Sequence, residues 1–411
     1  METVESAIAK IRQHLRPLPA CSMPLAASLA RVLAAEVVSD VDSPPHDKSI
    51  VDGYAIHASL IDAPRTPLTL LEEVVAGSLP TKAIEPGTCT RIMTGAPIPA
   101  ATAGVVMIEK TQVADGKIVI DESKITLGQN IARRGSSMKT GEVVLSPGTK
   151  IRGIEMGLLA EVGCTHPTVV PAARVAILAT GNELVDPSEK PPAGALRNSN
   201  SSLLAGLAES CGAVVTILGI ARDDRDSLEQ HIAAGLQHDL LLLSGGVSAG
   251  VLDLVPQVLE SLGVKNHFHK VSLKPGKPLW FGTKDRSTPS HPDAPPTLVF
   301  GLPGNPVSGL VCFELFVRTA IATLQGLASS SIQRLPAALS KTHTCRGDRP
   351  TFWPGKLLTG EATKLLVEPL SWKGSGDLRT LAQADALICF PAGDITYERE
   401  AEVIVQPLSG S

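Results

Sequence analysis

Aromatic residues are scarce in this sequence. Phe, Trp and Tyr make up only 3% of the 411 residues, whereas 36 glycines and 32 prolines are present. The cores must therefore be built mainly from aliphatic side chains, and turns must be frequent. The hydrophobic content of 43% is that of a globular protein. The length exceeds what one ordinary core accommodates and predicts two to four domains.

A surplus of basic residues is also missing. The formal net charge is −4, which argues against a general nucleic-acid binder but leaves room for a local basic site for a small anion. No run of about 18 apolar residues is evident, so we expect no membrane partner. The N-terminal stretch METVESAIAKIRQHL is amphipathic and lacks the apolar core of a signal peptide.

Paired-cysteine motifs and metal-binding spacings are absent from the sequence. The seven cysteines are scattered, their number is odd and no CxxC occurs, which predicts reduced thiols in a cytoplasmic protein. The ten histidines show no zinc-site spacing. Walker A and GxGxxG motifs are lacking as well, which argues against a P-loop kinase and a dinucleotide dehydrogenase.

The periodicity of apolar residues changes along the chain. Residues 4–16 and 23–36 have apolar positions three and four apart, which predicts two helices. From about Leu68 to Val170, short β-rich runs are punctuated by Gly and Pro, and we expect a small all-β barrel or sandwich there. Short strands return from Ile332 onward and predict a small C-terminal β domain.

Strands and helices alternate between Arg174 and about Gly326. Strands are predicted at 174–180, 213–221, 239–246 and 297–304, and helices at 202–212, 226–238, 255–263 and 306–326. Each strand is a continuous apolar run, as expected when both faces of a sheet are covered. The pattern predicts a parallel, doubly wound α/β domain. The polar segment 283–296 is expected to be a surface loop or a hairpin tip.

Ligands of open α/β sheets bind beyond the carboxyl ends of the strands. Those ends carry the segments TGNE (180–183), RDD (222–224), SGGVS (244–248) and GLPGNPVS (301–308), with Asp253 a little downstream and Lys274 and Lys277 in the segment SLKPGKP. Backbone N–H groups of such loops hold phosphate. Carboxylates at Glu183, Asp223 and Asp253 would hold Mg²⁺ together with ligand phosphates. The two lysines would supply positive charge to an anion.

Each of these features also has a purely structural explanation. Gly and Asn at strand ends commonly form turns. Asp223 or Asp224 is suitable for capping the helix that follows, and Asn305-Pro306 is a common way to begin a helix. Lysines in loops are more often solvated than functional. The clustering of Gly or acid at four strand ends favours a site for a phosphorylated ligand and a divalent metal.

Seven motifs together resemble those of MoeA-type molybdopterin molybdenumtransferases, the family that includes the gephyrin E domain. They are, in the family's order, DKSIVDGYA (47–55), RIMTGAPIP (91–99), ARRGSSMKTGE (132–142), ATGNEL (179–184), SGGVSAG (244–250), LKPGKP (273–278) and GLPGNPVS (301–308). The resemblance covers essentially the whole chain. The combination of motifs is specific, whereas any single one would be weak.

The resemblance implies a multidomain fold of the α/β plus β class. A doubly wound, molybdopterin-binding-like α/β domain would carry an inserted N-terminal β domain, a linking domain and a C-terminal β-barrel-like domain. The expected boundaries are 1–19 for an N-terminal helix packing on the α/β domain, 20–46 with 137–172 for the linking domain, 47–136 for the insertion, 173–328 for the α/β domain and 329–411 for the last domain. The family forms elongated homodimers, whose cleft combines the α/β domain with the partner's inserted β domain.

The implied reaction converts adenylyl-molybdopterin and molybdate into molybdenum-loaded molybdopterin and AMP, with Mg²⁺ as cofactor. The resemblance assigns catalytic roles to Asp52, Thr94, Asp223, Asp253, Lys274 and Lys277. It assigns substrate binding to Glu183, Gly245, Gly246, Val247, Ser248, Pro303, Gly304, Asn305, Pro306, Arg349 and Ser375, and metal binding to Glu183, Asp223 and Asp253. Within these sets, Ser248 and the two lysines correspond to positions linked to molybdate or phosphate.

Three departures from the family pattern are present. Val51 stands where the family often has Met before Asp52, and Ser136 and Ser137 replace the acidic pair that commonly follows RRG. Lys373 replaces a glutamine in the last domain, which bears on a second oxyanion subsite.

Two other functions compete with molybdenum insertion. The preceding adenylyltransferase shares the α/β fold but consists essentially of that domain alone; transient contact with that enzyme is also expected. A scaffold protein would usually carry linked extra domains, and no long disordered linker is evident here.

Overall fold

The computed structural model describes residues 1–61, 63, 65–246, 254–289, 294–327, 334–360 and 364–408. The chain forms two compact units, one comprising Met1–Ala34, Pro147–Gly153 and Thr168–Ser411, and the other comprising Ala35–Ser146 and Ile154–Pro167. We call them unit 1 and unit 2. Each contains a hydrophobic core of its own.

A six-stranded sheet forms the centre of unit 1. Its order is β17 (Val214–Ala221), β14 (Arg174–Thr180), β18 (Leu240–Ser244), β21 (Thr297–Leu302), β20 (Trp280–Lys284) and β19 (Val264–His269). The first four strands are parallel, whereas β20 runs antiparallel to both of its neighbours. All residues of β18 are buried, which explains why its sequence is a continuous leucine run rather than an alternating pattern.

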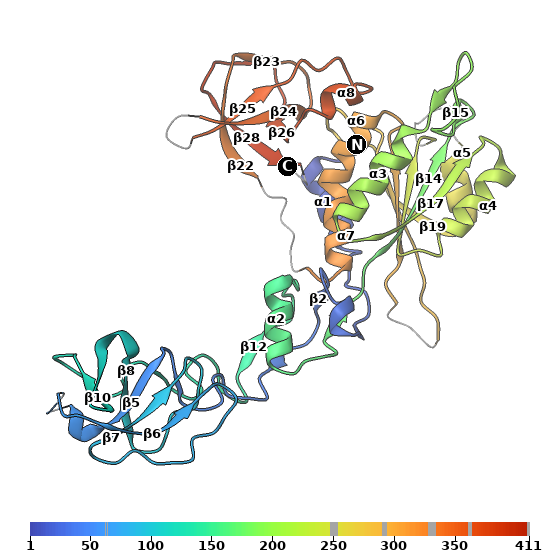
Figure 1. Cartoon of the computed structure of the whole chain (residues 1–411). Coiled ribbons are helices and arrows are strands. Elements are labelled where there is room, and N and C mark those ends of the chain that lie inside the picture. Colours follow the sequence, from blue (N-terminus) through green and yellow to red (C-terminus); the bar gives the residue numbers. More distant parts are fainter. Residues whose placement is uncertain are drawn as a thin grey trace. The chain divides into compact units, whose positions relative to one another are not determined.

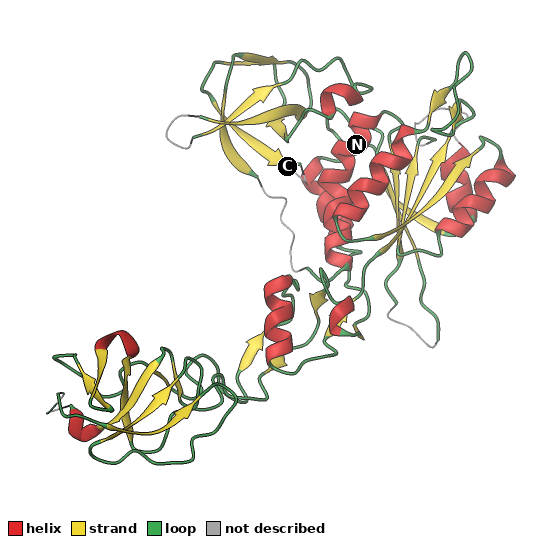
Figure 2. Cartoon of the chain, in the orientation of Figure 1, coloured by secondary structure: helices red, strands yellow, loops and turns green. Residues whose placement is uncertain are grey.

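Helices cover both faces of this sheet (Figure 2). On one face lie α1 (Val4–Arg12), α3 (Ser199–Ser210), α6 (Pro306–Cys312) and α7 (Arg318–Leu324), which share a core with alternate strand residues. On the other face lie α4 (Arg225–Gly235) and α5 (Leu254–Ser261). In Figure 1 the N-terminal helix α1 lies beside α6 and α7, far from it in sequence. The sheet is therefore doubly wound, as the sequence predicted.

A nearly continuous helix, Pro306–Leu324, crosses the core of unit 1. Its middle turn, Phe313–Val317, is a π-helix. By length and composition this 19-residue segment would suffice to cross a membrane, although Glu314 and Arg318 interrupt its apolar sequence. However, 89% of its most apolar stretch is buried inside the protein. Burial of this kind is that of a core helix in a globular protein.

The C-terminal part of unit 1 is a closed barrel. Its strands are β22 (Leu335–Leu339), β25 (Leu365–Pro369), β24 (Thr351–Thr359), β26 (Ala386–Phe390) and β28 (Glu402–Pro407). A two-stranded antiparallel sheet of β23 (His343–Cys345) and β27 (Ile395–Tyr397) and the short helix α8 (Leu378–Leu381) complete it. Closure pairs every strand of the barrel on both sides and leaves no unpaired edge.

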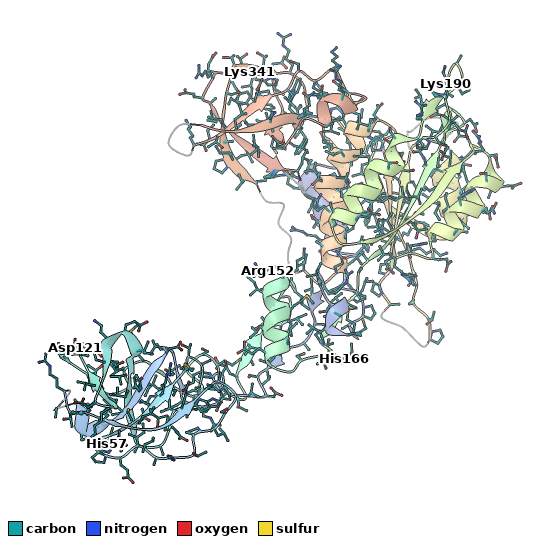
Figure 3. The ribbon with its side chains drawn as sticks, viewed as in Figure 1. His57, Asp121, Arg152, His166, Lys190 and Lys341 are labelled. Atoms are coloured by element: carbon teal, nitrogen blue, oxygen red, sulfur yellow. The ribbon has the colours of Figure 1, made fainter. Side chains whose placement is uncertain are left out.

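Unit 2 is mainly β structure. Its main sheet has the order β6 (Thr69–Val74), β7 (Thr88–Ile92), β5 (Gly53–His57) and β8 (Thr102–Met107), and a separate hairpin joins β9 (Thr111–Ala114) to β10 (Lys117–Ile120). His57, labelled in Figure 3, is the last residue of β5, and Asp121, also labelled, directly follows β10. Short pairs connect β3 (Val37–Val38) with β12 (Val143–Leu145), and β4 (Lys48–Ser49) with β11 (Ile131–Ala132). The helix α2 spans Gly153–Glu161.

Three predictions about local structure were wrong. The stretch from about Leu68 to Val170, expected to be all β, contains the helix α2. The helix predicted over 23–36 is absent: this stretch contains a 3₁₀ turn at Leu25–Ala27 and the strand β2 (Val32–Leu33), which pairs with β13 (Thr168–Val170). Pairing with a distant strand has overridden the local helical pattern. The strands β19 and β20 were not predicted, and β20 makes the sheet mixed rather than purely parallel.

Candidate active site

The glycine loop after β18 packs directly on the end of β14. Gly245 and Gly246 have φ angles of 91° and 64°. A Cβ on Gly245 would lie 2.7 Å from the carbonyl oxygen of Thr180, and one on Gly246 would lie 2.5 Å from the Thr180 hydroxyl. Both the backbone conformation and the close approach therefore require glycine. Gly245 and Gly246 therefore lie against the end of β14 at Thr180.

The loop after β21 approaches the same place. An ideal Cβ on Gly304 would lie 3.7 Å from the Cα of Gly245. The amide nitrogen Nδ2 of Asn200 bridges the two loops, because it donates to the Gly304 carbonyl oxygen at 2.7 Å and to the Ser244 hydroxyl at 2.8 Å. Asn305 and Pro306 then begin α6, as predicted, although the Asn305 side chain makes no capping hydrogen bond.

Sequence reasoning missed Asn200. It lies in the first turn of α3, which begins at Ser199, whereas the apolar pattern placed the start of this helix at Ser202. The signal that was available is the polar run RNSN (197–200), which directly precedes the apolar face of the helix. Such runs usually supply helix caps, and Asn198 does cap α3 by accepting from the Ser201 N–H at 3.1 Å.

The acidic side of the site joins the loops after β14 and β17. The backbone N–H of Asn182 donates to Asp223 Oδ2, and the N–H of Asp223 donates to Asn182 Oδ1, both at 3.2 Å. Glu183 folds back over Gly181, where a Cβ would lie only 2.6 Å from its carboxylate. The helix α4 is capped by Asp224, not by Asp223. The capping explanation therefore does not account for Asp223.

The segment around the two lysines is fixed against the barrel. The backbone N–H of Lys274 donates to the Pro350 carbonyl at 2.8 Å, and its Nζ donates to the Arg346 carbonyl at 3.1 Å. On its other side, Gly276 has a φ of 120°, and a Cβ there would lie 2.8 Å from Cys312 Sγ. The backbone of this basic loop is therefore positioned by its neighbours.

Lys277, in contrast to the half-buried Lys274, is exposed. It lies close enough to Asp348 to contribute, after the dominant hydrogen bond from Arg349, to lowering the pKa of that carboxyl group. An exposed lysine ammonium at the edge of a fixed loop is available to an incoming anion.

Two further predicted residues connect the barrel with the α/β part of unit 1. Arg349 Nη1 donates to the carbonyl of Leu273 at 3.3 Å. The carbonyl oxygen of Ser375 accepts from the N–H of Val307 at 3.0 Å, in the first turn of α6. Contacts of the barrel thus extend from the basic loop to the start of α6, beside the glycine loops. Most of the predicted site residues that the structure describes in unit 1 therefore lie on the side of the sheet where the parallel strands have their carboxyl ends.

The predicted metal ligands are only partly described. Val247, Ser248 and Asp253 lie outside the described residues. Within the described part of the chain, no group of three or more His, Cys, Asp and Glu side chains is arranged to hold a metal ion. Glu183 and Asp223 are exposed carboxylates at adjacent strand ends. Few carboxylates combined with ligand phosphates suit Mg²⁺, so this donor set fits a metal that arrives with a phosphorylated ligand.

The predicted pair Asp52 and Thr94 lies together in unit 2. Asp52 Oδ1 accepts from both the backbone N–H and the hydroxyl of Thr94, each at 2.7 Å. These two bonds, with the backbone bond dominant, lower the pKa of Asp52 below the ordinary value. The side chain is exposed and therefore presents a stable negative charge to solvent at neutral pH.

The whole chain matches known proteins. Residues 2–163 match the family model described as the MoeA N-terminal region (domain I and II), residues 176–323 the probable molybdopterin binding domain, and residues 336–408 the MoeA C-terminal region (domain IV). The protein named molybdopterin molybdenumtransferase from Synechocystis is 31% identical over 400 residues, covering 97% of each chain. The protein of the same name from Nostoc is 33% identical to this chain, and the match covers 93% of this chain and 87% of the Nostoc protein.

A solved structure also matches the full length. The crystal structure of the molybdopterin biosynthesis MoeA protein from Pyrococcus horikoshii OT3 is 28% identical, with a TM-score of 0.81, and the match covers 99% of this chain and 100% of the other. The likeness extends over both units and includes the inserted domain and the C-terminal barrel.

Proposed function

The chain belongs to the MoeA family of molybdopterin molybdenumtransferases, and from this premise we propose how its residues serve the reaction. It is a transferase of molybdenum cofactor biosynthesis that inserts molybdenum into molybdopterin. We infer that the pterin enters as adenylyl-molybdopterin, that molybdate is the second substrate, and that AMP is released. The observation that supports this best is the gathering of glycine loops, carboxylates and fixed lysines at one edge of the sheet.

Molybdate is a tetrahedral dianion, for which ammonium groups and N–H donors are the natural receptors. Lys274 and Lys277 would bind it, since the first is held in place by the barrel and the second is exposed beside it. The backbone of Gly245 and Gly246 would receive the phosphates of the pterin nucleotide. These residues bind and orient the two reactants, so positioning and electrostatics carry the catalysis.

Magnesium would be held by Glu183 and Asp223, with Asp253 as a third candidate ligand. When bound, Mg²⁺ neutralises charge on the pyrophosphate that links pterin and AMP. Glu183 and Asp223 follow β14 and β17, whereas the basic loop lies between β19 and β20, on the other side of the glycine loops. We expect this separation of charge to orient a substrate that carries both phosphates and a metal.

We further infer that the enzyme acts as a cytoplasmic homodimer. All seven cysteines are unpaired, which supports a reducing compartment. Asp52 and Thr94 would complete the partner's cleft. Transient contact with the adenylyltransferase would shorten the transfer of the adenylylated pterin.

Neither competing function accounts for the architecture. An adenylyltransferase of this fold needs only the α/β domain, whereas this chain matches MoeA models before and after it. The scaffold function explains neither the fixed lysines nor the glycine loops.

The test is AMP release from adenylyl-molybdopterin by the purified full-length chain. We expect release that requires both molybdate and Mg²⁺ and is abolished by chelating the metal. Release without molybdate, or no release under any condition, would overturn the proposed reaction.

A further inference from the structure

A small polar layer lies beneath the glycine loops of unit 1. Thr180 and Ser244 end the neighbouring strands β14 and β18, and each is only 3% exposed. Asn200 reaches Ser244 from the first turn of α3. In a fold whose strand cores are aliphatic, three polar side chains at one strand edge are expected to satisfy one another by hydrogen bonding.

They do so only in part. Asn200 donates both of its side-chain N–H groups, to the Ser244 hydroxyl and to the Gly304 carbonyl. Among the described residues, the carbonyl oxygen Oδ1 of Asn200 and the hydroxyl of Thr180 are both buried and have no hydrogen-bond partner. Buried polar groups without partners are uncommon and destabilising. Their presence directly under the loops expected to bind substrate indicates a role in binding rather than in stability.

The two donated bonds explain what Asn200 does in the absence of substrate. They tie the end of β18 to the loop after β21, at 2.8 and 2.7 Å. Gly245 and Gly304 are thereby kept adjacent, with the Gly304 Cβ position 3.7 Å from the Gly245 Cα. Without this clamp, the spacing between the two loops would depend on backbone contacts alone.

We propose that Asn200 is a substrate-positioning residue of the molybdenum insertion site. Its amide nitrogen sets the spacing of the loops after β18 and β21, so that the backbone of Gly245 and Gly304 is held in place for the pterin nucleotide that binds to those loops. This inference rests on the proposed function, because it names the pterin nucleotide as the ligand. The glycine loops that Asn200 holds are the expected receptors of phosphate, which makes the nucleotide rather than molybdate the reactant concerned.

Asn198 provides a matched control two residues away. It belongs to the same polar run, but among the described residues its side chain bonds only to Ser201 in α3: it accepts from the Ser201 N–H at 3.1 Å and donates to the Ser201 hydroxyl at 2.9 Å. Its replacement removes a helix cap without touching either glycine loop. A purely structural role of Asn200 would therefore resemble that of Asn198.

The experiment compares wild type, Asn200→Ala, Asn200→Asp and Asn198→Ala. For each protein, the thermal midpoint and the KM and kcat for adenylyl-molybdopterin at saturating molybdate are measured. We expect Asn200→Ala to raise KM about tenfold with kcat changed less than about twofold. The isosteric Asn200→Asp should raise KM further, because it places a carboxylate oxygen against the Gly304 carbonyl and beside the substrate phosphates.

Asn198→Ala should lower the thermal midpoint and leave KM unchanged. If wild type is active but both Asn200 variants keep the wild-type KM, or merely lose stability as Asn198→Ala does, the positioning role is wrong while the proposed function stands. If wild type itself releases no AMP, the proposed function fails instead. Because Asn200→Asp preserves the side-chain volume, it still decides the question if Asn200→Ala does not fold.

Discussion

At the scale of single residues, close backbone approaches define the candidate site more sharply than charges do. Gly246 carries a φ of 64° and has the Thr180 hydroxyl and Val255 within 2.7 Å of its missing Cβ. The sequence predicted these glycines as a phosphate loop because they follow a buried strand. It could not predict Asn200, whose role depends on side-chain contacts with residues 44 and 104 positions away.

Replacing Gly246 by Ala should test this packing. Gly194 provides the control, because its φ is 84° but nothing lies within 4 Å of its Cβ position. Both variants strain the backbone, and only Gly246→Ala adds overpacking, which typically costs about 1–3 kcal/mol. Urea denaturation should show that excess, together with loss of AMP release in Gly246→Ala alone. Equal stability of the two variants would contradict the close approach to Thr180.

At the scale of elements, the series of alternating strand-like and helix-like segments predicted secondary structure reliably. The helical spacing of a single stretch outside that series did not. The four parallel strands and the helices between them follow the predicted ranges closely. In β14, β18 and β21 the reason is that a strand buried on both faces leaves an unmistakable apolar run, whereas the edge strand β17 has an apolar sequence although most of it is not buried. The 23–36 stretch has helical spacing, yet Val32 and Leu33 pair with the distant strand β13. The strands β19 and β20 were not predicted. The burial of β19 is mixed, and β20 is a short strand with four buried residues followed by the half-buried Lys284, so neither shows a long apolar run.

The π turn of the core helix contains an ion pair whose stability can be measured. Glu314 is 1% exposed and receives two bonds from Arg318, at 2.6 and 2.7 Å. Glu314→Ala leaves the guanidinium of Arg318, whose side chain is 22% exposed, without its carboxylate partner and should cost about 3–5 kcal/mol in the free energy of unfolding.

A double variant, Glu314→Leu with Arg318→Met, should recover most of that loss, since apolar replacement of a buried pair is often neutral. The exposed pair of Arg225 and Glu229, 4.0 Å apart, is the comparison. Glu229→Ala should change the free energy of unfolding by less than about 0.5 kcal/mol. A similar small effect of Glu314→Ala would show that the buried pair does not stabilise the core.

The contact between the N-terminal segment and the sheet should make stability depend on pH. The rings of His14 and His267 lie 3.9 Å apart. Burial lowers the pKa of His267 from 6.5 to about 4, with contributions from His14, Lys265 and Lys10, and burial also lowers the pKa of His14. The unfolded chain therefore binds more protons between pH 6.5 and 4, so the free energy of unfolding should fall as the pH falls through this range.

His267→Gln should flatten this dependence while retaining a side chain able to bond to Thr283, the present partner of His267 at 2.8 Å. Denaturation series from pH 8 to 4 would reveal it. At pH 8 the ring is neutral in both states, so the two proteins should differ there by a constant offset alone. Parallel curves down to pH 4 would exclude this protonation as a source of acid sensitivity.

At the scale of the whole molecule, the proposed site residues come from two units that fold around separate cores. Asp52 and Thr94 belong to unit 2, whereas the glycine loops and lysines belong to unit 1. No spacing rule linked Asp52 to the other site residues; only the family resemblance did so. The physical reason is that contributions from separately folded parts leave no shared periodicity in the sequence.

Asp52→Ala should therefore spare folding and cut AMP release. The side chain is exposed and bonds only to Thr94 among the hydrogen bonds found in the described part of unit 2, so the thermal midpoint should change little. Asp121, exposed in the same unit (Figure 3), is the control, and Asp121→Ala should release AMP at the wild-type rate. Normal release by Asp52→Ala would remove this carboxylate from the reaction.

The most direct test of molybdenum insertion is molybdate-dependent AMP release by wild type, Lys274→Ala and Lys341→Ala. Lys341 is an exposed barrel lysine paired with Glu368 (Figure 3). We expect wild type and Lys341→Ala to respond to molybdate alike, and Lys274→Ala to need at least about tenfold more molybdate for half-maximal release. Equal molybdate responses of wild type and Lys274→Ala would remove that lysine from the oxyanion site. No molybdate-dependent release from wild type would contradict molybdenum insertion itself.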